Sequence, residues 1–195
     1  MPSPNIQYAY DYLTGDQVVE ATDGRVQPMT PEGASGLIGG WIVETGSEDL
    51  SNLDVIEKKA RKGRGMSQYT DTRRIPYDAA RLKAIDQGID PNSIEWQMDY
   101  AIDEYMGKHD GPSGNSLSGW TRAMENFGQY DDVTKAATGF TVGIDGKEGY
   151  FRPSKPHVDR RIEAAQRVYS YMTRPQALQT LNEIRSRFDA AIPPQ

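Results

Sequence analysis

Residues 30–46 read TPEGASGLIGGWIVETG, and this stretch decides the fold. Thr30 is a favourable N-cap and Pro31 suits the first helical position, so we expect a helix to begin there. Gly46 suits the position after a helix, because glycine adopts the left-handed conformation at little cost. Between these ends, apolar side chains recur at helical spacing and predict a buried face. They are Leu37, Ile38, Trp41 and Ile42.

Three glycines fall within five positions of this predicted helix, at Gly36, Gly39 and Gly40. Each one costs roughly 1 kcal/mol of helix propensity relative to alanine. A helix that carries all three therefore indicates that another element or a ligand approaches its backbone closely.

Glu44 stands at the C-terminal end of the predicted helix, three residues after Trp41 and four after Gly40. This spacing places its carboxyl at the edge of the apolar face. Partial burial beside an indole and the negative end of the helix dipole both favour the protonated form, which a general acid needs near neutral pH. On spacing alone, a solvated glutamate that ends an ordinary helix is the more common arrangement.

The composition narrows the classes of function. The net charge is −6 in 195 residues, which disfavours nucleic acid as a partner and gives no steering toward an anionic cell wall. The chain has no cysteine, and its two histidines, His109 and His157, lack zinc-binding spacing. These features argue against thiol and zinc peptidases, and they leave cleavage of glycans by carboxylates open. We expect no metal and no cofactor.

The N-terminus, Met1-Pro2-Ser3-Pro4, lacks the basic and apolar run of a signal peptide. No apolar stretch approaches the roughly 20 residues of a membrane span. We therefore expect a soluble chain that is made in the cytoplasm and has no membrane span.

The rest of the chain predicts further helices and one small hairpin. Residues 61–75 combine glycines with a polar run and predict a short β-hairpin or extended loop, and residues 14–29 predict a loop. Helices are expected at 5–13, 76–87, from Pro91 with Asp90 as the cap until Gly107, from 116 or 118 to 127, 133–140, 158–172 and 175–188. The expected fold class is α+β and mostly α-helical.

Residues 36–46 read GLIGGWIVETG. This segment resembles the active-site helix of the phage tail lysozyme family, whose members read Gly-Ile-x-Gly-Asn, three residues, and then Glu-Ser-Gly. The family belongs to the lysozyme-like superfamily, together with goose-type lysozymes and lytic transglycosylases. The resemblance implies a lysozyme-like domain.

Three further blocks follow in the order of that family. Residues 65–74 (GMSQYTDTRR) are similar to its Gly-x-x-Gln-Trp-Thr-x-x-Arg hairpin, which lines the cleft, and residues 94–100 (IEWQMDY) are similar to its Leu-x-x-Gln-x-x-Tyr helix. Residues 133–165 are similar to its last block, with Tyr150-Phe151-Arg152-Pro153, then Arg160 or Arg161 and a pair of alanines. Together the blocks cover about residues 30–173.

The resemblance implies that Glu44 is the catalytic acid. Glu44 would protonate the glycosidic oxygen and then act as a base toward water or toward a hydroxyl of the sugar itself. Gln68 and Tyr69 would bind substrate, through an amide hydrogen bond and ring stacking, and Tyr150 would contact the sugar or the Glu44 carboxyl. The alternatives are a solvent-facing loop position for Gln68 and Tyr69 and a core position for Tyr150.

A second carboxylate is not identified by the sequence, and a solvated acidic loop explains every candidate equally well. The candidates are Glu48, Asp49, Asp54 and Asp71. Arg73, Arg74 and Arg152 are expected to form structural ion pairs. The chain also departs from the family: Gly40, Thr45, Tyr69 and Phe151 replace Asn, Ser, Trp and Glu, and residues 144–149 resemble an insertion.

We expect an N-terminal segment at 1–29, a lysozyme-like domain with a small hairpin at 30–173, and a C-terminal helix with an extended tail at 174–195. The expected function is that of a virion-associated glycosidase, of lysozyme or lytic transglycosylase type, that cleaves the β-1,4 bond between N-acetylmuramic acid and N-acetylglucosamine in peptidoglycan during phage entry. It would lie in the tail or among the ejected proteins, beside other virion proteins. Two alternatives stay open: a catalytically inactive virion structural protein with the same fold, and a soluble endolysin that acts at host lysis.

Overall fold

The computed structural model describes residues 2–24, 26–57, 63–106, 108–109, 128–143, 149–151 and 157–191, with the backbone alone for residues 105 and 175–191. Within these residues the protein is helical and contains no strand. The helices are α1 (Pro4–Thr14), α2 (Asp16–Ala21), α3 (Pro31–Thr45), α4 (Asp71–Asp86), α5 (Ile94–Tyr105), α7 (Val133–Val142) and α8 (Val158–Ala191).

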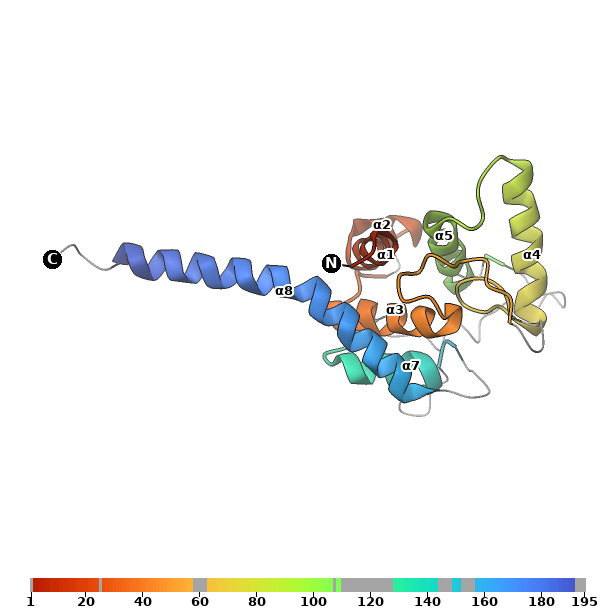
Figure 1. The fold of residues 1–195 in the computed structure, drawn as a ribbon. Coiled ribbons are helices and arrows are strands. Elements are labelled where there is room, and N and C mark those ends of the chain that lie inside the picture. The colour runs from red at the N-terminus through yellow and green to blue at the C-terminus, as the bar shows by residue number, and fades with distance from the viewer. Residues whose placement is uncertain are drawn as a thin grey trace.

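Helix α3 lies at the centre of the molecule. It packs against α1 on one side and against α7 and α8 on the other, so it is buried almost all round rather than along one face (Figure 1). Helix α5 closes the body beside α1 and α2. The helix that the sequence predicts most strongly is therefore the one around which the others assemble.

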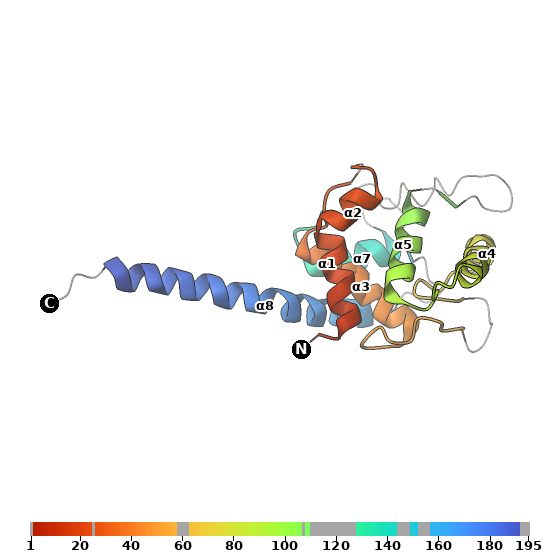
Figure 2. The same cartoon turned by 90° about the horizontal axis from the view of Figure 1, so that it is seen from above.

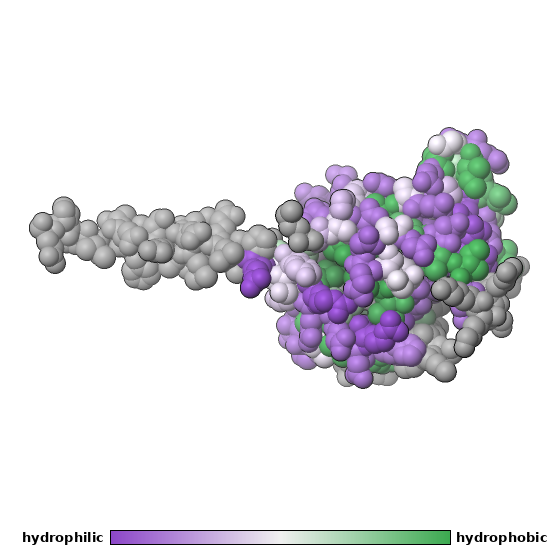
Figure 3. Space-filling view, in the orientation of Figure 1, coloured by the Kyte–Doolittle hydropathy of each residue, from purple (hydrophilic) through white to green (hydrophobic). Residues whose placement is uncertain are grey.

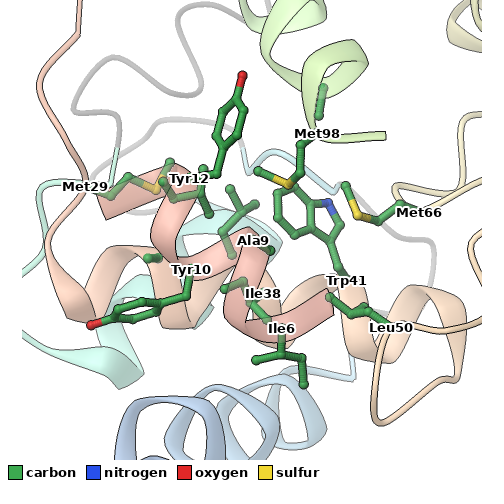
Figure 4. Close-up of a cluster of buried hydrophobic side chains, with 14 of the residues drawn as sticks. Ile6, Ala9, Tyr10, Tyr12, Met29, Ile38, Trp41, Leu50, Met66 and Met98 are labelled. Carbon is green, nitrogen blue, oxygen red and sulfur yellow. The ribbon is translucent and has the colours of Figure 1, made fainter. Parts of the chain in front are cut away.

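Helices α1 and α3 both contribute to the main core. Ile6, Ala9 and Tyr10 of α1 belong to the same buried cluster as Ile38 and Trp41 of α3 (Figure 4). The predicted helix at 5–13 is thus confirmed, and it contributes to the core although it precedes the predicted lysozyme-like domain. The division of the chain into segments remains a prediction.

The loop expected at 14–29 and the cap expected for α5 are wrong, and the small hairpin is not shown. Helix α2 lies in the segment 14–29 that was expected to be a loop. In place of the hairpin at 61–75, the described residues form two isolated antiparallel bridges, Ile56 with Arg64 and Arg64 with Tyr69, followed directly by α4. The cap of α5 is Ser93 rather than Asp90, since the Ser93 hydroxyl accepts a hydrogen bond from the Trp96 N–H at 3.2 Å.

Helix α4 begins five residues earlier than the predicted start at Pro76, and it contains that proline. Its buried positions recur at helical spacing, but two of them are arginines: Arg73, Tyr77, Arg81 and Ala84. An apolar pattern therefore cannot detect this face. Proline inside the helix is compatible with helical φ, although it removes one backbone donor.

Helix α8 is continuous through Pro175, where the sequence predicted two separate helices. The proline signal for a helix start fails here, because the φ angle of proline is also that of a helix interior. The first half of α8 packs against α3 and α7, whereas the second half projects away from the body (Figures 1 and 2). The helix predicted near 116–127, and Arg152, lie outside the described residues.

Candidate active site

The ends of α3 form as the sequence predicts. The Thr30 hydroxyl accepts a hydrogen bond from the Gly33 N–H at 3.1 Å and donates to the Tyr130 carbonyl at 2.7 Å. Gly46 ends the helix in the left-handed conformation, with φ at 64°. These contacts fix the helix on which Glu44 lies, and they also tie its N-terminus to the segment before α7.

The glycines of α3 allow other elements to touch its backbone. A Cβ on Gly39 would lie 2.6 Å from the backbone nitrogen of Ala165 in α8, and one on Gly40 would lie 2.0 Å from the ring of Phe151. Gly36 faces α7 in the same way, at Ala136. The close approach predicted from the sequence is thus made by other parts of the chain, and it brings α8 and Phe151 against the last turns of α3.

Arg161 of α8 pairs with Glu44. The Arg161 Nη2 donates to Glu44 Oε1 at 2.6 Å, and Nη1 donates to the Gly40 carbonyl at 3.2 Å. The guanidinium also lies over the Phe151 ring, at 4.8 Å from its centroid. Arg161 is 2% exposed, whereas the Glu44 side chain keeps 15% of its surface exposed. Glu44 is therefore held from the buried side and reaches solvent at the other.

This pair adds a positive charge that the sequence argument for Glu44 did not include. From the sequence, only burial and the helix terminus were expected to act on this carboxyl, and both oppose the ionisation of a carboxyl. A guanidinium within hydrogen-bond distance stabilises the carboxylate. Any reaction of the Glu44 carboxyl therefore takes place beside the Arg161 guanidinium.

A chain of buried hydrogen bonds begins at Trp41, one turn before Glu44. The Trp41 Nε1 donates to Ser67 Oγ at 3.0 Å, and Ser67 Oγ hydrogen-bonds the Tyr150 hydroxyl at 3.0 Å. The Tyr150 hydroxyl donates in turn to Glu104 Oε2 at 3.3 Å. Buried polar groups need partners of this kind, and here each partner comes from a different segment.

The chain ends in a second ion pair. Arg73 of α4 donates to both oxygens of Glu104 on α5, at 2.6 and 2.7 Å. The Arg73 guanidinium also lies over the rings of Tyr69 and Tyr150, at 4.9 and 5.1 Å from their centroids. The structural ion pair expected for Arg73 is confirmed, and Arg74 likewise pairs with Asp78.

Comparison with known families gives one match. A family model described as phage tail lysozyme matches residues 24–172. The chain belongs to the phage tail lysozyme family. No curated protein and no solved structure matches the chain. Membership in this family indicates a lysozyme-like peptidoglycan hydrolase as the class of protein.

Gln68 stabilises the loop in which it lies. Its amide Nε2 donates to the carbonyls of Gly65 and Val55, at 3.0 and 3.2 Å. The side chain is partly buried, and φ is positive at 47°. A substrate contact by this residue remains a prediction, and these bonds show what it would give up on turning to a sugar.

Tyr69 and Tyr150 both lie inside the protein. The Tyr69 ring stacks on Tyr77 at 4.3 Å and meets Tyr100 edge-on at 5.1 Å, and burial raises its pKa well above the usual range. Burial, with the charge of Glu104 next in size, raises the pKa of Tyr150 to about 12. Both rings are covered in this conformation. Their expected contacts with sugar therefore remain predictions, and this structure does not support them.

The four candidates for a second carboxylate have separate surroundings. Glu48 is exposed and pairs with Arg167 of α8 at 2.8 Å, six residues beyond Arg161. Asp49 accepts hydrogen bonds from the hydroxyl of Ser47 and the N–H of Ser51, which lower its pKa to about 2. Asp71 is exposed at the start of α4.

Asp54, the fourth candidate, is held by arginines. Burial raises its pKa, but the hydrogen bond from Arg64 at 2.8 Å and the charge of Arg81 at 3.1 Å outweigh burial, and the net pKa is lowered. A lowered pKa suits an ionised partner rather than a proton donor. Glu48 is the candidate tied, like Glu44, to an arginine of α8.

The sequence did not give Arg161 a role, although it placed Arg160 or Arg161 in the last family block. The signal that could have identified it is a basic residue four positions before Ala165, the residue that meets Gly39. Among the described residues, no group of three or more acidic, histidine or cysteine side chains could hold a metal ion. The helices described here also include none that is both long and apolar enough to cross a membrane.

Proposed function

We propose that this protein cleaves the β-1,4 bond between N-acetylmuramic acid and N-acetylglucosamine, with Glu44 as general acid and then base. The observation that carries the proposal is the placement of Glu44. Glu44 lies in the last turn of the glycine-containing helix α3 and is partly exposed to solvent. On its buried side it forms an ion pair with Arg161.

The chemistry needs one proton and one carboxyl. Glu44 donates its proton to the glycosidic oxygen as the bond to the anomeric carbon breaks, which leaves a carboxylate beside the Arg161 guanidinium. The carboxylate then removes a proton from the incoming water, or from a hydroxyl of the same sugar, as that oxygen bonds to the anomeric carbon. Glu44 is protonated again at the end of either route.

Arg161 contributes at the step in which Glu44 has given up its proton. Its guanidinium stabilises the carboxylate that exists only after the proton has left, and it orients Oε1 through a charge-assisted hydrogen bond. Because Arg161 also donates to the Gly40 carbonyl, its position is fixed by the backbone that carries Glu44. We assign Arg161 as a positioning residue for Glu44.

The place of action that we propose is the virion, in the tail or among the ejected proteins, where the enzyme would open the bacterial wall during entry. The family to which the chain belongs supports this location. Proteomics of washed phage particles is the test. Detection in particles supports the proposal, whereas detection in the infected-cell lysate alone would favour an endolysin that acts at lysis.

A second candidate is a virion protein that keeps the fold without catalysis. The burial of Tyr69 and Tyr150 favours this candidate, because neither ring is open to a sugar. The two candidates are separated by incubation of wild-type protein with purified peptidoglycan over a range of pH, followed by mass spectrometry of soluble muropeptides. Hydrolysis and transglycosylation give products that differ by one water, and an absence of products at every pH would support the inactive protein.

A further inference from the structure

A loop at residues 46–52, called here the 46–52 loop, follows directly after the last turn of α3. Ser47 is buried, and its hydroxyl accepts hydrogen bonds from the N–H groups of Ser51 and Asn52, at 3.0 and 3.3 Å. The Ser47 N–H donates to the Thr45 hydroxyl at 3.2 Å. The 46–52 loop and the last turn of α3 are therefore joined by hydrogen bonds.

Leu50 has an unusual backbone conformation within this loop. Its φ angle is 55°, in the left-handed region that residues with a Cβ rarely adopt. Such a conformation persists only where the surroundings fix it. The Leu50 side chain is 0% exposed and belongs to the same buried cluster as Ile6 and Trp41 (Figure 4). Leu50 is therefore the point at which the 46–52 loop is anchored to the body.

Helix α1 holds the backbone at this anchor. The Asn5 Nδ2 donates to the Leu50 carbonyl at 2.8 Å, and the Ser3 hydroxyl donates to the Asp49 carbonyl at 2.7 Å. The Ser3 hydroxyl also caps α1, so the first turn of this helix and the loop share a side chain. Helix α1 precedes residues 24–172, the region that matches the family model. These contacts therefore come from outside the matched region.

On its other side the loop meets α8 through the pair of Glu48 with Arg167. Both side chains are well exposed, at 76% and 46%, and exposed pairs contribute little to stability. The first turn of α1, the loop and the first half of α8 lie on the same side of the body (Figures 1 and 2), where hydrophilic residues predominate (Figure 3). The loop thus depends chiefly on α1 for its position.

We propose that Asn5 is a positioning residue for Glu44. By holding the Leu50 carbonyl, Asn5 fixes the 46–52 loop and, with it, the last turn of α3 that carries the Glu44 carboxyl. A displacement of about 1 Å can slow catalysis roughly 10²-fold, so the hold on this turn affects the reaction. The effect on catalysis rests on the proposed function, whereas the hold on the loop does not.

The test is Asn5→Asp in the full chain. Aspartate keeps the shape and suits the first turn of α1, where negative charge is favourable, but it cannot donate to the Leu50 carbonyl. Amide hydrogen exchange of residues 44–52, measured by NMR, should become roughly three- to tenfold faster, as expected for the loss of one hydrogen bond. The kcat for muropeptide release should fall roughly three- to tenfold while KM stays unchanged, because a misplaced carboxyl affects the reaction rather than binding.

Gln7→Glu is the matched control. It makes the same change from amide to carboxylate two residues later on α1, where the amide donates only to Asp11 of the same helix, at 2.9 Å. The new carboxylate repels Asp11 and so weakens α1 itself, but the bond from Asn5 to Leu50 is kept. This control should show the loop exchange and the kcat of wild type.

The outcomes separate the proposal from the proposed function. Melting curves establish that each variant is folded. Loop exchange that Asn5→Asp leaves unchanged overturns the proposal, as does faster exchange with the kcat of wild type. An equal loss in Gln7→Glu would assign the effect to α1 as a whole and also overturns it. If wild type releases no muropeptides, the proposed function fails instead, and the exchange measurement alone decides whether Asn5 fixes the last turn of α3.

Discussion

Two of the arginine–glutamate pairs in the described part of the chain have a buried arginine, and they differ in what surrounds the glutamate. Arg73 and Glu104 are both enclosed, share two short hydrogen bonds and are capped by the Tyr150 hydroxyl. Arg161 is equally buried, but its partner Glu44 lies at the rim and reaches solvent. The first pair joins α4 to α5, whereas the second joins α8 to the end of α3.

The difference separates a structural pair from a chemical one. A buried pair with all partners satisfied is costly to break, and its carboxyl is shielded from substrate. A carboxyl that is held on one side and open on the other can meet a glycosidic oxygen while its orientation stays fixed. The family match does not itself distinguish the two glutamates, but their surroundings do.

The largest effect is expected for Glu44→Gln. Glutamine keeps the shape and accepts a hydrogen bond from Arg161, but it cannot donate a carboxylic proton, so muropeptide release should fall by roughly 10²–10⁴-fold. Because this change also leaves the buried Arg161 without a counter-charge, some stability should be lost as well, so cleavage is compared per folded molecule, below the melting transition of each variant.

Glu48→Gln is the matched control. It removes the same charge four residues later, where the carboxylate is exposed and pairs with Arg167. We expect it to keep most of the cleavage activity. Equal activity of Glu44→Gln and wild type would remove Glu44 from the mechanism.

The reverse pattern is expected for Glu104→Gln. This change leaves Arg73 buried without a counter-charge, so the free energy of unfolding should fall by roughly 3–5 kcal/mol. Cleavage per folded molecule should stay near that of wild type, measured below the melting transition.

The double change Arg73→Met with Glu104→Met sharpens this result. Replacement of both charges by apolar side chains should recover much of the lost stability, as measured by denaturant unfolding. Loss of cleavage in stable Glu104 variants would instead connect this pair to the chemistry.

A smaller effect on activity is expected for Arg161→Lys. Lysine keeps the positive charge but cannot bond the Gly40 carbonyl and Glu44 in the same planar geometry. We expect a decrease in kcat of about tenfold with little change in KM, because a misplaced carboxyl affects the reaction rather than binding. A kcat equal to that of wild type would show that Arg161 does not position Glu44.

The smallest effect concerns Tyr150 and alkaline pH. Because its pKa is about 12 in the folded protein against 10.0 for the free side chain, the folded state retains this proton between those values while the unfolded chain loses it. The contribution of Tyr150 to stability is therefore complete below about pH 10 and is lost as the pH rises toward 12.

Tyr150→Phe removes this dependence. Wild type should be more stable than the variant by about 1 kcal/mol near pH 8, through the hydrogen bonds of the hydroxyl. That difference should shrink above about pH 10 in unfolding curves. A difference that is constant with pH would mean that the phenol does not titrate as proposed.

The sequence predicted the helix that carries Glu44 better than the surroundings of the other candidate site residues. Glu44 lies on a helix whose cap, apolar spacing and final glycine are all local signals, and each was confirmed. Gln68, Tyr69 and Tyr150 were placed in a cleft through motif similarity alone. A motif gives no information about burial. In the structure, Tyr69 packs against rings of α4 and α5, and Tyr150 lies under the guanidinium of Arg73 of α4.

The sequence by itself determined where α3 begins and ends and that another element or a ligand approaches its glycines, because helix caps and steric limits act over a few residues. Tertiary structure alone decided that Arg161 reaches Glu44, since the two residues are 117 positions apart and nothing local links them. Tertiary structure also decided the orientation of α4. Its arginines Arg73 and Arg81 face inward because they form ion pairs there with Glu104 and Asp54. A charge enters the interior only where the rest of the chain supplies its counter-charge, and that supply is a property of the whole fold.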